Sequence, residues 1–211
     1  MKSTIALSIS AFFLAGLLAM PAATAQMSTL AGLFENAPVT SLHVYAYRGA
    51  QIPADHPFVG QAIPSNFHNL FQGEFRPMLE GGAEVYATQR FQSGSIDYYL
   101  VRVVAGSGEG LMNALYLFRG DAQGMHAVSM LSLASCARRI CAQQDAWLEN
   151  LPGGAGLGLL IKSQRVSDSG ELLSQMSQWM VQEPNGAFRA ATPDEIAALP
   201  QESGYVLRDL P

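Results

Sequence analysis

The stretch EVYATQRFQSGSIDYYLVRVVAGSGEGLMNALYLFRGDAQGMHAVSMLSL, residues 84–133, decides the fold class of this chain. It contains four short segments rich in Val, Tyr, Phe and Leu, separated by turns that contain glycine. The segments recur every 10–14 residues or so, a spacing typical of sequential antiparallel strands. We therefore expect strands at 84–92, 95–104, 111–119 and 125–133, joined as a meander.

The second of these segments, 95–104, is apolar on both of its alternating faces. Tyr98 and Leu100 fall on one face, and Tyr99 and Val101 on the other. A strand with one face in water alternates apolar and polar residues, so this pattern predicts a central strand that is buried on both sides.

The flanking sequence extends the sheet and adds short helices at its two ends. Ser28 followed by Leu30 and Phe34 predicts an N-terminal helix capped by the serine. Thr192-Pro193-Asp194-Glu195 is a capping box that predicts a terminal helix at 194–199. The expected fold is mainly β (α+β), an antiparallel β-meander with short N- and C-terminal helices. Further strands are expected at 41–48, 146–148, 157–166, 173–182 and 187–190, the last following a tight turn at Asn185-Gly186, and a helical turn at 65–71.

The first 25 residues have the pattern of a cleavable signal peptide. Lys2 precedes an apolar run from Ile5 to Met20, and Ala23-Thr24-Ala25 is a small-x-small cleavage site. The run is shorter than the roughly 20 apolar residues that a membrane span needs. We expect cleavage near Ala25, a single exported domain at 26–211, no stable membrane insertion after cleavage, and a periplasmic or secreted location.

The charge balance narrows the classes of partner. The chain has 12 Lys and Arg against 17 Asp and Glu, a formal net charge of −5 at pH 7. Nucleic acids and anionic membrane surfaces recruit proteins through Lys and Arg, so this balance argues against both. It suits a basic protein partner. The sequence leaves the oligomeric state open.

Cys136 and Cys141 are the only cysteines, and four residues separate them. A close, even pair in an exported chain predicts a disulfide. Arg138 and Arg139 would also suit a reactive thiolate, but redox pairs usually have two intervening residues. A structural zinc site needs four ligands, and we find no such set in the sequence.

Residues 141–188 resemble one blade of the integrin-type FG-GAP β-propeller repeats. Trp147-Leu148, Gly153 and Leu159 match that pattern, in which a strand leads through an acidic calcium loop into a hairpin. The loop is degenerate here, because the family's ligand positions hold non-acidic residues. Since calcium takes six to eight oxygen ligands, we expect no bound calcium, no other metal and no cofactor. The four substituted positions are Asn150, Pro152, Gly154 and Gly158.

No hydrolase elbow, zinc-protease or phosphate-loop motif occurs in the chain. His43 and His126 lie beside apolar residues within expected strands, which favours hydrogen-bonded structural roles. Asp55, His56 and His68 lie in a proline-rich region before the sheet and form the one candidate set for a base and its orienting group.

Two hypotheses follow. The leading one is an exported, non-enzymatic binding protein that blocks or scaffolds another periplasmic or secreted protein. The alternative is a small periplasmic hydrolase that uses Asp55, His56 and His68.

Overall fold

The computed structural model describes residues 22–38, 41–49, 51–137 and 139–207, without the side chains of Ala22, Glu74 and Glu109. Most of the predicted signal peptide, residues 1–21, lies outside this range. Helix α1 runs from Ala22 to Ala31 and so crosses the predicted cleavage position. The prediction that Ser28 caps this helix is wrong, because the helix is already formed six residues earlier.

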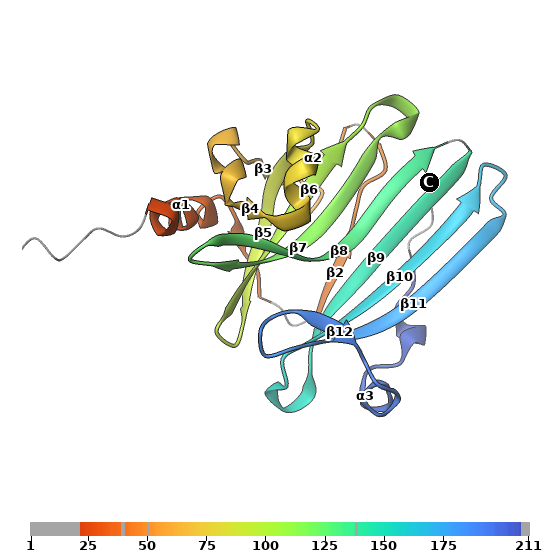
Figure 1. Cartoon of the computed structure of the whole chain (residues 1–211). Coiled ribbons are helices and arrows are strands. Elements are labelled where there is room, and N and C mark those ends of the chain that lie inside the picture. Colours follow the sequence, from red (N-terminus) through yellow and green to blue (C-terminus); the bar gives the residue numbers. More distant parts are fainter. Residues whose placement is uncertain (1–21, 39–40, 50, 138, 208–211) are drawn as a thin grey trace, which may run out of the picture.

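All twelve described strands belong to one sheet, and β5 to β12 form an antiparallel meander in chain order (Figure 1). The predicted fold class is therefore confirmed. Two short parallel pairs, β1 with β5 and β4 with β8, make the sheet mixed. The strands are β1 Glu35–Asn36, β2 Ser41–Tyr45, β3 Gln61–Ala62, β4 Phe71–Gln72, β5 Glu84–Ser93, β6 Ile96–Ala105, β7 Met112–Asp121, β8 Gly124–Ala137, β9 Ile140–Asn150, β10 Leu157–Ser167, β11 Leu172–Gln182 and β12 Phe188–Ala190.

Helices cover the sheet on the side of its first strands. Alongside α1 lie α2, Arg76–Glu80, and two 3₁₀ turns, η1 at Ser65–Leu70 and η2 at Gly73–Phe75. The remaining helices are α3 Pro193–Ala198 and the 3₁₀ turns η3 Gly108–Gly110, η4 Pro152–Gly154 and η5 Glu202–Gly204. Within the described residues, none of them has the length and apolar character of a membrane-crossing helix.

Strand β6 is buried on both faces, as its sequence predicts. Tyr99 and Val101 pack under the helices in a helix-side core. Tyr98 and Leu100 face an inner core, to which the distant strands β2, β9 and β10 also contribute. The sheet therefore bends around the inner core. The inner core consists of Val44, Phe58, Phe91, Tyr98, Leu100, Leu115, Leu117, Leu131, Ala146, Leu148, Leu157, Leu159 and Ile161.

Strand β2 separates two strands that are neighbours in the sequence. β8 and β9 are paired only near their hairpin turn, as far as the cross-strand pair of Leu133 and Gln144. The residues of β9 that follow Gln144 pair with β2 instead. Ser132 lies where β9 changes its partner from β8 to β2, and we call this point the branch of the sheet. Its buried hydroxyl accepts a hydrogen bond from the Ala46 N–H at 2.5 Å and donates one to the Gln144 carbonyl at 2.8 Å.

The C-terminal tail packs on the outer face of β9–β11. Trp147, Leu160 and Trp179 are buried there beneath the tail, and we call this group the C-terminal cluster. Lys162 holds the tail, because its ammonium donates to the carbonyl oxygens of Glu202 and Tyr205, both at 2.7 Å. The residues that the tail contributes are Ala191, Leu199, Tyr205 and Leu207.

Two local predictions are confirmed near the C-terminus. The capping box forms: the Glu195 N–H donates to the Thr192 hydroxyl at 3.4 Å, and the Glu195 carboxylate accepts from the Thr192 N–H at 2.8 Å. The turn before β12 contains Gly186 at a φ of +83°, where a side chain would be strained and would also meet Ile96.

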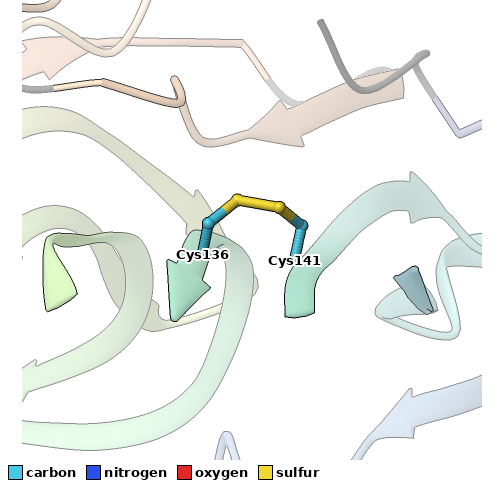
Figure 2. Close-up of a disulfide and its surroundings, with 2 residues drawn as sticks. All are labelled: Cys136 and Cys141. Carbon is cyan, nitrogen blue, oxygen red and sulfur yellow. A yellow bond between two sulfur atoms is a disulfide. The ribbon is translucent and has the colours of Figure 1, made fainter. Parts of the chain in front are cut away.

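The predicted disulfide is present and joins the two strands at the β8–β9 turn (Figure 2). Cys136 and Cys141 are direct cross-strand partners with a Cα–Cα distance of 4.0 Å and an S–S distance of 2.10 Å. The hairpin is longer than predicted on both strands: β8 continues to Ala137 and β9 begins at Ile140.

Candidate functional site

Beyond the cores, β8–β11 continue as two hairpins that extend the sheet at one end of the molecule (Figure 1). We call this part, residues 134–144 and 162–178, the distal sheet. None of its described residues belongs to one of the buried hydrophobic clusters. The tips of its hairpins are linked, since the Asp168 N–H donates to the Arg139 carbonyl at 3.0 Å. Because the distal sheet extends past the buried cores, its exposed surface is available for contacts with other molecules.

The outer strand of the distal sheet is the first half of β11. Its residues from Leu172 to Gln178 are all exposed. On the side away from β10, the described part of the chain provides one neighbouring strand, β12, and β12 pairs only with Met180–Gln182. The main-chain edge of Leu172–Gln178 therefore lacks a strand partner among the described residues.

Apolar side chains are concentrated on this edge. Leu172, Leu173 and Met176 are 53%, 48% and 51% exposed, and they are three of the five large hydrophobic side chains exposed in the described residues. Leu172–Gln178 also contains no charged residue and no proline. Natural edge strands usually carry such residues because they prevent pairing with other chains.

The pairing of β11 with β12 shows which main-chain groups of β11 point away from β10. The Ala191 N–H donates to the Trp179 carbonyl at 2.9 Å, so the hydrogen-bonding groups of Trp179 point away from β10. In an antiparallel strand this direction alternates, which makes Ser177 and Gln175 the next residues to present an N–H and a C=O outward. A register shift opposite Arg165 and Val166 places a bulge near Leu173, at the far end of the edge.

Three glutamines lie in register across the distal sheet. Gln143, Gln164 and Gln175 are consecutive cross-strand partners on β9, β10 and β11. The Gln164 amide donates to the Gln143 side-chain oxygen at 3.3 Å, and Gln143 donates to Asp145 at 3.5 Å. This glutamine row ends at Gln175, which is exposed at the sheet edge.

The same face holds a half-buried histidine hydrogen-bonded to a buried aspartate next to the distal sheet. His43 Nε2 lies 3.0 Å from an Asp145 carboxylate oxygen, and Asp145 is completely buried. The His43 ring stacks on Trp147 with centroids 4.5 Å apart and planes 5° from parallel. A half-buried, hydrogen-bonded role for His43 was predicted, and the structure confirms it. Because the ring is fixed by Trp147 and Asp145, the pair ties β2 to β9.

The three residues of the hydrolase hypothesis have different surroundings. His56 lies among Tyr45, Tyr47 and Phe58, with ring centroids 4.9–6.0 Å away, and its Nδ1 accepts from the Phe58 N–H at 3.2 Å. Asp55 is exposed in the loop beside it.

His68 lies in η1, between Phe67 and Leu70 of the helix-side core. A cleft of about 530 Å³ is lined by His56 but by neither Asp55 nor His68. The structure thus gives His68 neighbours other than those of His56. Among the side chains described, no group of three His, Cys, Asp or Glu converges on a point where a metal ion would bind.

The comparisons with known proteins do not assign this chain to a protein family. No protein-family profile, curated protein sequence or solved structure matches this chain significantly. Any functional argument therefore rests on the residues themselves.

Sequence reasoning identified β11 as a strand but missed that its first half is an unprotected edge. The available signal was the uncharged run 172–178 directly after a hairpin that carries Asp168 and Glu171. The sequence does not indicate how far β12 pairs along β11, and this extent decides how much of the β11 edge is left without a strand partner.

Proposed function

We propose that this chain acts as a binding protein, and that it binds by accepting an extended protein segment as an additional strand along Leu172–Gln178. The observation that supports this most directly is a run of seven exposed, uncharged residues on an edge that has no described strand partner. Main-chain hydrogen bonds provide affinity in strand addition, and alternate side chains provide specificity. Leu172 and Met176 would supply the apolar contacts.

The rest of the distal sheet supports such a role. β11 is paired along its inner side with β10, and β10 is paired with β9. The Cys136–Cys141 disulfide fixes the neighbouring hairpin. A prearranged edge loses little conformational entropy when a partner binds, and this raises the affinity available from a short contact. Such an edge suits a protein that blocks or scaffolds another protein.

The hydrolase alternative needs Asp55, His56 and His68 to act on one substrate. The cleft at His56 is lined by neither of the other two residues, and His68 lies in η1 between two residues of the helix-side core, Phe67 and Leu70. We therefore favour binding over hydrolysis as the function of this chain.

We further propose that the chain is exported and cleaved near Ala25. Among the described side chains of α1, the three that are buried, Met27, Leu30 and Ala31, all follow that position, so cleavage leaves them in the helix-side core. The disulfide is compatible with an oxidising compartment. Mass spectrometry of the exported protein tests this proposal: a chain that begins at Gln26 supports it, and an intact N-terminus contradicts it.

Site-specific photo-crosslinking tests the binding function. A photoreactive residue replaces Met176 at the edge, and a matched control replaces Val206, which is 74% exposed in the C-terminal tail. Each probe is then combined with Gln175→Lys, which places a charge on the edge, or with Gln201→Lys, which adds the same charge to an exposed turn.

The expected result is a protein adduct at position 176 that Gln175→Lys abolishes and Gln201→Lys preserves. The Val206 probe should give no such adduct. If position 176 gives no adduct, or if its adduct survives Gln175→Lys, the edge of β11 is not the binding element.

A further inference from the structure

We infer that the segment that pairs with this edge is β11 of a second copy of the same chain, related by a two-fold axis at Gln175. This inference rests on the proposed function and names its partner. In this arrangement the two β11 strands run antiparallel, and the two meanders join into one continuous sheet.

The hydrogen-bonding pattern selects the register. Gln175 and Ser177 present their main-chain groups outward, and Trp179 already bonds to Ala191. A two-fold axis at Gln175 lets both Gln175 residues exchange N–H and C=O bonds, and it places Ser177 opposite Leu173. An axis at Ser177 would require the Trp179 carbonyl that β12 occupies. An axis at Leu173 would fall at the bulge. An axis at Met176 would pair each Gln175 with a Ser177 and would interrupt the glutamine row, so Gln175 is the centre at which the rows of the two copies meet.

The side chains complement one another in that register. On one face, the glutamine row Gln143–Gln164–Gln175 meets its own copy, which produces a continuous row across six strands. Stacked or paired amide side chains form hydrogen-bonded ladders in extended sheets. On the other face, Met176 of each copy lies opposite Ser174 of the second copy and covers it. An amide row that ends in solvent in one copy is thus continued by the second.

Charge also favours a second copy over a basic partner. The chain is acidic overall, yet Leu172–Gln178 contributes no carboxylate with which to attract a basic segment, and the Glu202 carboxylate of the tail, which lies beside this edge, accepts a hydrogen bond from the Ser177 hydroxyl at 2.6 Å. Like charges opposite each other destabilise paired strands, and a neutral strand that pairs with itself avoids this cost. The complement of a neutral, amide-rich and partly apolar edge is a strand of the same composition.

Sedimentation and spin-label distances test the inference on the protein purified with its native disulfide. Sedimentation from low to high micromolar concentration reports the oligomeric state of the wild type, Gln175→Lys and Gln201→Lys. Circular dichroism verifies that each variant is folded. For the distance measurement, Gln178→Cys supplies a single free thiol, because both native cysteines are in the disulfide.

The register predicts the distance between the two labels. With Gln175 at the axis, each Gln178 lies opposite Leu172 of the second copy, so the two Gln178 Cα atoms are about 20 Å apart along the strands at about 3.4 Å per residue. An axis two residues away changes this separation by about 14 Å. The distance thus identifies the register as well as the dimer.

The expected result is a concentration-dependent dimer with a separation near 20 Å. We expect Gln175→Lys to weaken its association about tenfold or more and Gln201→Lys to leave it unchanged. A protein that stays monomeric overturns this inference but not the proposed function, if the Met176 probe still gives an edge-dependent adduct with another protein. A dimer that is insensitive to Gln175→Lys overturns the inference, and an adduct equally insensitive to that change overturns the proposed function as well.

Discussion

Ser132→Ala tests whether one hydroxyl holds together the three strands at the branch of the sheet. Ser132 is fully buried on β8, accepts from the Ala46 N–H beyond β2, and donates to the Gln144 carbonyl on β9. Alanine keeps the backbone and nearly the same volume but loses both hydrogen bonds.

The size of the effect follows from the two main-chain groups affected. Removing one partner of a buried hydrogen bond costs about 1–3 kcal/mol, so the loss of both is expected to lower the free energy of unfolding by about 2–6 kcal/mol. For a domain of this size, that corresponds to a decrease in Tm of about 4–24 °C.

Urea denaturation followed by far-ultraviolet circular dichroism measures this change. Ser129→Ala is the matched control on the same strand, because its hydroxyl is only partly buried and makes a single long contact of 3.5 Å to the Met130 carbonyl. The control should remain within about 0.5 kcal/mol of the wild type. If Ser132→Ala is equally mild, the hydroxyl does not join the strands and the argument for the branch is refuted.

Three further predictions concern the disulfide, the terminal helix and a buried phenol. Replacing Cys136 and Cys141 together by serine should cost no more than about 2 kcal/mol in urea denaturation, because the closed loop is short; a larger loss would show that the disulfide does more than restrict the unfolded chain. The Arg189 guanidinium and then the Thr192 N–H lower the pKa of Glu195 to about 2. This depressed value means that the helix cap contributes fully above about pH 4.5 and weakens as the pH falls toward 2. Nuclear magnetic resonance titration should therefore place the Glu195 midpoint near pH 2, and a midpoint near 4.5 would show that the cap does not form in solution. Burial raises the pKa of Tyr98 to about 12, so its neutral form stabilises the fold below pH 10 and this contribution declines toward pH 12. The pKa values of other tyrosines are raised as well, so ultraviolet titration of the wild type and of Tyr98→Phe is compared, and the difference should be one tyrosine with a midpoint near pH 12; a difference with a midpoint near pH 10 would show that Tyr98 is not buried in solution.

The sequence predicted the meander well because that information is local. Apolar alternation on β5–β8 and glycine-containing turns place each strand next to its successor without any long-range knowledge. The capping box at Thr192 and the Cys136–Cys141 pair are also local signals, and both are confirmed.

The branch and the distal sheet were not predictable in this way. β2 pairs with β9 across about a hundred residues, and nothing in the segment 41–45 indicates which strand it joins. Residues 140–145 contain two glutamines and an aspartate, so their propensity for strand is weak, and the pairing to β8 and the disulfide make them part of β9. The exposed edge of β11 depends on where β12 stops pairing, which is a property of the assembled sheet.

The C-terminal cluster gives this protein an intrinsic optical probe. The chain contains only two tryptophans, and both Trp147 and Trp179 lie in that cluster. Tyr205 of the tail contacts both rings, with centroids 5.5 Å and 5.8 Å away. Tryptophan fluorescence therefore reports on the docking of the tail and not on the distant helix-side core. If the tail detaches while the sheet stays intact, the emission should shift to the red at unchanged strand content, so that one unlabelled sample distinguishes local opening from global unfolding.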